Sequence, residues 1–297
     1  MDLEKGPRKS KLPFLRKFRH YWILPLITAG AWWGMLVALM AVWAGDGYGS
    51  HLFPSQVAGT YIPYISDIGA SGVQPVFIAC GIVQGVCFVL SVAAERYLRH
   101  AHRLAPNNYK REKYLGAAAI FFAFVSMIGI IFLTIFDTQH HHTAHMTNVC
   151  IFCAGAGVSA CCSIGEYWIL RRTYYEVQWL RFSYLLKFIW VVIALGLAIA
   201  FASVPSDYGS AAVEWSLAYF YPLYALILFV DLLPATKTSQ NREHSGGYPI
   251  TGALSAPSEA VPHTRVSDPQ PNAVPYKPSA QDGPVRPPTA YNTASNF

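Results

Sequence analysis

Charged side chains are scarce in this sequence. Asp, Glu, Lys and Arg make up 13% of its 297 residues, about half of the roughly 25% that soluble domains carry. Hydrophobic residues make up 53% of the chain. This composition is typical of a protein that crosses a membrane several times. The formal net charge of +6 could by itself suit nucleic acid, but the placement of the charges, described below, argues against that partner.

Other features are also missing. All six cysteines lie inside apolar runs, so the loops lack the residues that a disulfide framework needs. The sequence contains no Asn-x-Ser/Thr sequon, nucleotide-binding loop, nucleophile elbow or dinucleotide fingerprint. The Cys150-x-x-Cys153 spacing is a weak motif, because membrane-buried cysteines mostly act as small packing residues. We therefore expect no N-glycan, no cofactor and no known catalytic motif.

Six apolar runs are long enough to cross a bilayer. They lie at about residues 22–44, 75–94, 115–136, 145–170, 183–203 and 213–233. The runs predict an all-α membrane protein, a six-transmembrane helical bundle over residues 22–233. A basic N-terminal arm, residues 1–21, precedes the bundle. The tail, residues 234–297, holds 11 of the 20 prolines and almost no apolar clusters, which predicts disorder.

The basic residues divide cleanly between the loops. All 22 Lys and Arg lie in the arm, in the second and fourth loops with their flanks, or in the tail, and the first, third and fifth loops have none. The positive-inside rule then places both termini in the cytoplasm. This surface is expected to meet anionic inner-leaflet lipids, through Arg96, Arg99, Arg103, Lys110, Arg111, Lys113, Arg171 and Arg172.

Three charged residues fall within the runs near their predicted cytoplasmic ends. Lys187 is expected to snorkel to the cytoplasmic surface. Glu166 and Asp231 are expected to pair with Arg171 or Arg172, or to snorkel as well. With these assignments no span interior carries the paired charges that a transport pathway usually needs, so a small transporter is the weaker interpretation.

A polar turn of unusual composition joins the third and fourth runs. Residues 136–145 read Phe-Asp-Thr-Gln-His-His-His-Thr-Ala-His and hold four of the chain's ten histidines. If the following helix begins early enough, His141 and His145 share a face, and a carboxylate could complete a zinc site with them. Two other interpretations stay open: an exposed turn whose histidines bond loop carbonyls, and a site that senses protons or binds lipid headgroups.

More polar residues are predicted on the same, outer face. The apolar segment 61–69 is expected to pack back on the bundle as a short half-helix capped by Ser66 or Asp67. Glu214 begins the sixth run. We expect an outer recognition cluster of Asp67, Asp137, His141, His145 and Glu214.

The fourth run is rich in small residues. Gly155-x-x-x-Ser159 has the spacing that lets membrane helices approach closely, so this helix is expected at the centre of the bundle.

Three short motifs carry a family resemblance. They are Tyr-Ile-Pro-Tyr-Ile-Ser-Asp-Ile-Gly at residues 61–69, the His145 turn before a small-residue helix, and Val213-Glu-Trp215. Together they resemble the FRAG/DRAM/Sfk family of damage-regulated autophagy modulators and fungal suppressor-of-four-kinase proteins. The resemblance covers about residues 20–233, and the basic arm and long tail make the chain most similar to the fungal branch. His140 to His142 depart from the family pattern.

The resemblance implies a non-enzymatic protein with several spans and without transferable catalytic residues. Fungal members act at the plasma membrane and are linked to phosphatidylinositol 4-kinase recruitment, phospholipid asymmetry and sterol retention. The expected role is regulation of plasma-membrane lipid organisation and phosphoinositide signalling, with phospholipids and a lipid-kinase complex as partners. The alternatives are a metal-dependent membrane lipid hydrolase that uses the outer Asp/His cluster, and a vacuolar or lysosomal autophagy modulator.

Overall fold

The structure is a computed structural model that describes residues 20–46, 53, 55–56, 61–175 and 177–236. The chain separates into two units, residues 1–251 and 252–297, and all described residues belong to the first. The predicted N-terminal arm, apart from its last two residues, and almost all of the predicted tail lie outside the described residues.

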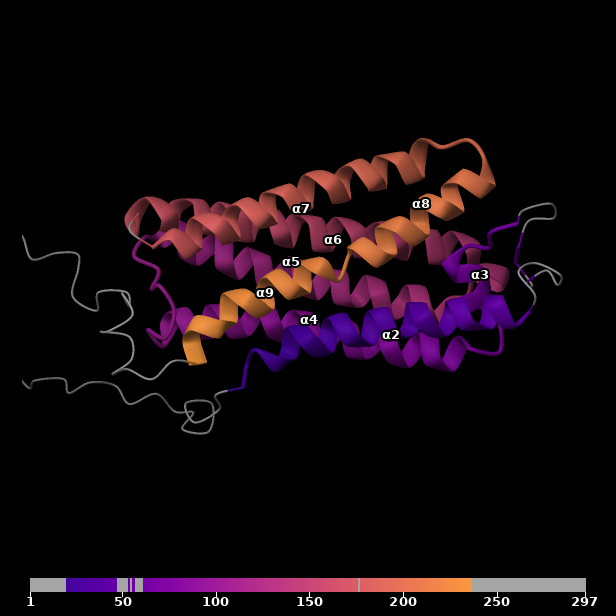
Figure 1. Ribbon diagram of the computed structural model, residues 1–297, viewed down its shortest axis with the longest axis horizontal. Helices are drawn as coiled ribbons and strands as arrows, with labels where there is room; N and C mark the ends of the chain where they lie inside the picture. The colour runs from indigo at the N-terminus through magenta and orange to yellow at the C-terminus, as the bar shows by residue number, and fades with distance from the viewer. Residues whose placement is uncertain (1–19, 47–52, 54, 57–60, 176, 237–297) are drawn as a thin grey trace, which may run out of the picture. The chain divides into compact units, whose positions relative to one another are not determined.

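The described part of the chain is built from helices and contains no strand (Figure 1). Its helices are α2 (Ile23–Gly45), α3 (Ile65–Gly69), α4 (Gln74–His100), α5 (Lys110–Ile135), α6 (Thr138–Thr173), α7 (Gln178–Ser203), α8 (Asp207–Phe220), α9 (Leu223–Leu232) and the 3-10 helix η1 (Leu233–Thr236). Six segments, with α8, α9 and η1 taken as one, are long and apolar enough to cross a membrane. The predicted six-span α-helical bundle is confirmed.

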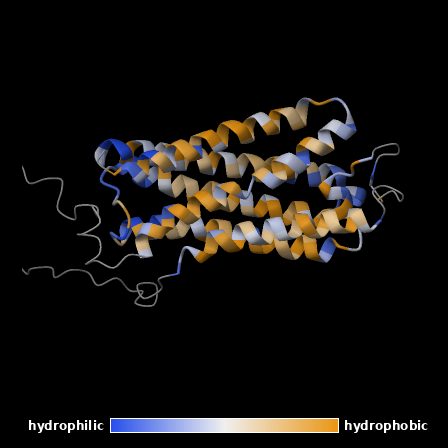
Figure 2. Ribbon diagram, in the orientation of Figure 1, coloured by the Kyte–Doolittle hydropathy of each residue, from blue (hydrophilic) through white to orange (hydrophobic). Residues whose placement is uncertain are grey.

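The bundle has two polar ends separated by an apolar middle (Figure 2). The end with the loops at 101–109 and after Thr173 is termed the basic end, and the end with α3 and the turn at Asp137 is termed the histidine end. Figure 1 draws them on the left and right. The helices extend past several of the predicted runs by one to two turns, because polar residues at their ends continue the helical hydrogen bonding.

Helices α5 and α6 cross at small residues. A Cβ built on Gly155 would lie 2.7 Å from the backbone nitrogen of Ser126, and one on Gly129 would lie 2.5 Å from the nitrogen of Phe152. The Ser126 hydroxyl donates to the Phe152 carbonyl (3.1 Å), and the Ser159 hydroxyl donates to a carbonyl of α5 (2.8 Å). The close approach predicted at Gly155 and Ser159 is therefore found where α5 and α6 cross.

The sixth span is broken between α8 and α9. Pro222 has no N–H, so the helical hydrogen bond to the carbonyl of residue 218 cannot form. Instead, the carbonyls of residues 218–220 accept hydrogen bonds from three indoles, those of Trp32 (2.8 Å), Trp33 (3.1 Å) and Trp190 (3.3 Å). Because lipid offers no replacement partner, these indoles of α2 and α7 are what makes a break at this depth stable.

The first prediction concerns the α5–α6 crossing. Gly155→Ala is expected to lower the free energy of unfolding by about 1–3 kcal/mol, because the added methyl group has to push two backbones apart. Gly157→Ala is the matched control on the same helix, where an added Cβ meets nothing within 4 Å. Unfolding of both variants in one detergent is the measurement. Equal stability of the two variants would contradict the close approach.

Candidate functional site

The first polar site surrounds α3 at the histidine end. Tyr64 precedes the helix, and Asp67, in its first turn, accepts hydrogen bonds from the Tyr64 N–H (3.0 Å) and the Ser55 hydroxyl (2.6 Å). The half-helix expected in this segment is therefore present, but its N-cap is Tyr64 rather than Ser66 or Asp67, and Asp67 bonds back to Tyr64 from the first turn. Burial raises the pKa of Asp67, while the Ser55 hydroxyl, the Tyr64 N–H and the nearby His145 act in the opposite direction.

Two side chains of α8 hold the segment that leads into α3 by hydrogen bonds. The Glu214 carboxylate accepts a hydrogen bond from the N–H of Ile65, the first residue of α3, at 2.9 Å. The neighbouring Trp215 indole donates to the Pro63 carbonyl at 3.0 Å. These two bonds join parts of the chain about 150 residues apart. Residues 63–65 are thus held on α8, the half of the sixth span that lies at the histidine end.

His145 lies against the same region from α6. It is 3% exposed, and its Nδ1 donates to the Phe136 carbonyl at 2.9 Å. This bond closes the turn between α5 and α6 and leaves Nε2 as the acceptor of the neutral ring. The structure therefore brings Asp67, Glu214 and His145 to one place around α3, as their predicted cluster requires.

Asp137 belongs to a separate polar group. It is the N-cap of α6 and accepts a hydrogen bond from the His140 N–H (2.6 Å), while the His140 ring Nδ1 lies 2.9 Å from the same carboxylate. Partial burial works in the opposite direction, but these hydrogen bonds lower the pKa of Asp137. The hydrogen bonds of Asp137 thus go to the start of α6 and to His140 rather than to the residues around α3.

The expected pairing of His141 with His145 is wrong. The backbone of His141 is non-helical, with φ −133° and ψ 44°, and interrupts α6. Its ring packs edge-on against Phe136, with the ring centroids 5.7 Å apart. Since no regular helix connects the two histidines, their four-residue spacing does not place them on one face.

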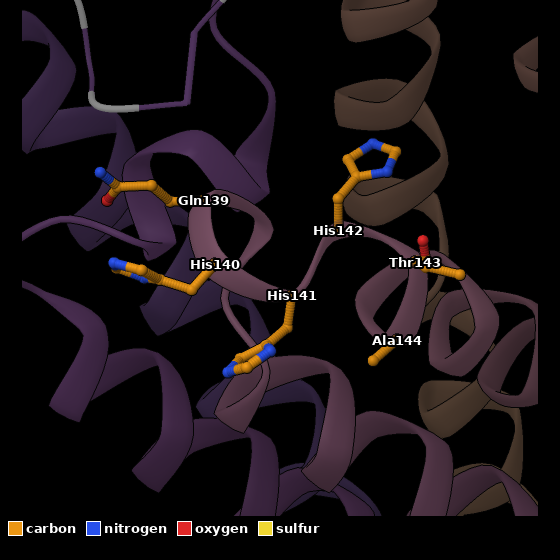
Figure 3. A pocket seen from close by; sticks show the side chains of 6 residues that line it. All are labelled: Gln139, His140, His141, His142, Thr143 and Ala144. Carbon is orange, nitrogen blue, oxygen red and sulfur yellow. The ribbon is translucent and has the colours of Figure 1, made fainter.

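An open pocket lies over this interruption. It has a volume of about 490 Å³ and is lined by residues 139–144. Figure 3 shows His142 pointing to the opposite side of the chain from His141. Within the described ranges, no three His, Cys, Asp or Glu side chains are grouped in a way that could hold a metal ion.

The second polar site was not expected and lies inside the basic end. Lys187 of α7 is fully buried. Its Nζ lies 2.7 Å from Asp231 of α9 and 4.0 Å from Glu95 of α4, and it donates to the Ser163 hydroxyl at 3.1 Å. The ring of Tyr167 faces the same ammonium at 3.5 Å. Two carboxylates, a hydroxyl and an aromatic face therefore surround one buried cation.

A second buried cation extends this network toward the loop after α4. Arg99 lies 2.7 Å from Glu95 and 3.5 Å from Glu166, and it donates to the Ala105 carbonyl at 3.1 Å. The Asn107 side chain donates to Glu166 at 2.7 Å. The network of Lys187, Asp231, Glu95, Arg99 and Glu166 is hereafter the buried ion network.

The buried ion network corrects several expectations. Arg99 was expected at the lipid surface but is 3% exposed. Lys187 does not snorkel, because its ammonium lies inside the bundle against Asp231. Glu166 and Asp231 find partners inside the bundle rather than in the arginines that follow. The expectation that no span interior carries paired charges is also wrong.

The remaining predicted lipid contacts differ in exposure. Lys110, Arg111, Lys113 and Arg172 are exposed, and Arg96, Arg103 and Arg171 are half-buried. Arg103 donates to the Ala235 carbonyl at 2.7 Å. The guanidinium of Arg171 lies 4.9 Å from the ring of Tyr184, and that of Arg172 lies 4.7 Å from the ring of Trp168.

The second prediction tests the attachment of α3 to α8. Glu214→Leu leaves the Ile65 N–H without its acceptor and is expected to cost about 1–3 kcal/mol. Glu214→Gln, the control, keeps an acceptor oxygen and should cost less. Hydrogen exchange at the Ile65 amide, measured beside thermal unfolding, should be faster in the leucine variant. Unchanged exchange there would show that Glu214 does not hold α3.

The third prediction separates a buried cation from an exposed one. Arg99→Met removes the cation that Glu95 and Glu166 share and is expected to cost about 3–5 kcal/mol. Lys113→Met, at the same end of the bundle, should change stability by no more than about 0.5 kcal/mol. Denaturation of both purified variants is the check, and a small effect of Arg99→Met would refute its placement in the network.

Comparisons with known proteins agree with this architecture. The family described as Frag1/DRAM/Sfk1/Cwh43P N-terminal domain matches residues 20–235. Protein SFK1 of Saccharomyces cerevisiae is 27% identical over 284 residues, which cover 74% of this chain and 80% of that protein. Protein sfk1 of Schizosaccharomyces pombe is 30% identical over 216 residues, covering 72% of this chain and 64% of that protein. No solved structure matches significantly. The chain is a multi-span membrane protein that belongs to the Frag1/DRAM/Sfk1 family.

Proposed function

We propose that this chain regulates lipid organisation and phosphoinositide signalling at the plasma membrane without catalysing a reaction. Membership of the family supports this role, because the family resemblance implies it for the fungal branch. In this proposal both termini and the basic end face the cytoplasm, as the distribution of Lys and Arg indicates. The partners are anionic lipids of the inner leaflet and a phosphatidylinositol 4-kinase complex.

One observation carries the proposal: acids and bases are sorted between the interior and the surface of the basic end. The described carboxylates at this end, Glu95, Glu112, Glu166 and Asp231, are all buried. The exposed cations Lys110, Arg111, Lys113, Arg172 and Arg181 form no ion pair with any carboxylate in the described part of the chain. The exposed rim is therefore positive, and it attracts anionic headgroups.

Aromatic rings lie against two arginines at the same end of the bundle. Arg171 and Arg172 end α6 and lie over the rings of Tyr184 and Trp168. A guanidinium stacked on a ring keeps its N–H groups at the edge of the plane, where they can donate in pairs to phosphate oxygens. Trp168 is 45% exposed, so the stack lies at the surface, where lipid headgroups can reach it.

The histidine end gives the hydrolase alternative little support. A catalytic zinc needs about three protein ligands and an open position. Here Glu214 and Asp67 each accept a hydrogen bond from a backbone N–H at the start of α3, and His141 lies on the other side of a break from His145. The arrangement supports a structural and recognition role for Asp67, His145 and Glu214.

The fourth prediction tests the positive rim. We expect a variant with glutamine at Lys110, Arg111, Lys113, Arg171 and Arg172 to bind phosphatidylserine and phosphatidylinositol 4-phosphate at least about tenfold more weakly, since each charge near an anionic surface contributes up to about 1 kcal/mol. Binding of phosphatidylcholine should stay the same. Native mass spectrometry with each lipid titrated separately is the measurement. The control exchanges Lys for Arg and Arg for Lys at the same positions.

The same variants test the cellular role. In Saccharomyces cerevisiae without its own Protein SFK1, the chain and its charge-keeping control should maintain plasma-membrane phosphatidylinositol 4-phosphate, while the glutamine variant should not. Equal activity of both variants would refute the proposal. Location at the vacuole would favour the autophagy alternative. One tightly bound zinc per chain, with a lipid-cleaving activity lost in His145→Ala, would put the hydrolase first.

A further inference from the structure

The two halves of the sixth span are attached to different parts of the molecule. Helix α8 holds residues 63–65 through Glu214 and Trp215. Helix α9 packs against α2, α4 and α7, and its buried Asp231 meets Lys187 of α7. Beyond α9, the Ala235 carbonyl accepts from Arg103. Helix α9 is therefore held at its far end by polar contacts in which α8 takes no part.

The hydrogen bonds at the break between the two halves do not involve α9, although the ring of Trp190 also lies 4.8 Å from the ring of Tyr224 in α9. The three capping indoles donate to carbonyls of α8, and they belong to α2 and α7. No atom of α9 takes part in these bonds. If α9 moved about Pro222, the end of α8 would keep its hydrogen-bond partners, so the movement would expose no new unpaired carbonyl there.

Stability alone does not explain the ion pair that holds α9. Lys187 is 0% and Asp231 is 2% exposed, and taking two charges out of water costs much of what their attraction returns. Apolar residues of similar volume usually hold such a site as well or better. Buried charge pairs do occur as contacts that are made in one arrangement of a protein and broken in another.

We propose that the Lys187–Asp231 pair is a lock on α9. When the pair is closed, α9 lies against α4 and α7, as the structure shows. When it opens, α9 pivots about Pro222 and the basic end opens to water between these helices. Since α9 leads through η1 toward the tail, the lock also sets where the chain leaves the membrane. The movement does not depend on the proposed function, whereas its effect on lipid signalling rests on that function.

A pair of cysteine reporters tests the movement. Ala235 is 2% exposed and follows α9, whereas Ala105 is 0% exposed at the same end and packs against Leu170 and Leu180. Ala235→Cys is the reporter and Ala105→Cys is the control. Each full-length variant in lipid nanodiscs is treated with a water-soluble maleimide, and site-resolved mass spectrometry gives the labelling rate of the introduced thiol.

The lock predicts three labelling rates. Asp231→Asn should speed labelling of the Ala235→Cys reporter at least about tenfold and leave the Ala105→Cys control unchanged. The double variant Lys187→Met/Asp231→Leu should keep the reporter as slow as it is beside the unaltered pair, because apolar packing replaces the attraction. If Asp231→Asn does not yield protein, Lys187→Met opens the same pair and takes its place. Slow reporter labelling in the single variant, equal acceleration of the control, or fast reporter labelling in the double variant would each overturn the lock.

The double variant also separates a lock from a fixed brace. A permanently closed α9 should fail to maintain plasma-membrane phosphatidylinositol 4-phosphate in yeast although the protein is folded, whereas a brace predicts full activity. Full activity of the double variant would overturn the regulatory part of the inference. If the unaltered chain itself has no such activity, the proposed function fails, and the labelling rates still decide whether α9 moves.

Discussion

A polar group inside a bilayer has to find its partner within the protein, because the lipid chains offer none. This constraint accounts for the placement of three tryptophans in this bundle. Trp32, Trp33 and Trp190 come from two helices that are distant in sequence, yet their indole N–H groups meet three successive carbonyls at the end of α8. Without them, the proline break would leave unpaired carbonyls in the apolar middle of the bundle. The arrangement of α2 and α7 around the sixth span is thus tied to one missing N–H.

The same constraint sorts the charges of the basic end. Carboxylates that lie within the helices cannot face lipid, so they turn inward and draw Arg99 and Lys187 with them. Among the described residues, the cations left at the rim form no ion pair with an acid. The positive surface that we propose binds anionic lipid and the interior that holds the buried ion network are therefore two results of one distribution. Moving a single acid to the rim would weaken both.

The sequence was sufficient to predict the spans, because the length of an apolar run gives the length of the span. It was also sufficient to predict the contact at Gly155, because small residues at that spacing indicate close approach whichever helix is the neighbour. It could not predict the partners of Lys187, because the rotation of each helix depends on packing between helices. Lys187 lies only four residues inside the predicted run, which begins at residue 183, so its position alone was compatible with snorkelling. The histidine turn shows a different limit. The spacing of His141 and His145 indicates a shared face only if the helix is continuous, and one non-helical residue removes that condition.

The sixth span carries a residue of each of the two polar sites. Its half at the histidine end carries Glu214 and its half at the basic end carries Asp231, but Pro222 interrupts the helix between them. A displacement at α3 therefore cannot pass to the buried ion network as a rigid movement of the sixth span. The unbroken part of α6 joins the two sites directly, because it carries His145 at the histidine end and Glu166 in the network. A second route leads through α7, which supports the break through the Trp190 indole and also carries Lys187. Any coupling between the two ends of the bundle thus depends on α6 and α7 rather than on the sixth span alone.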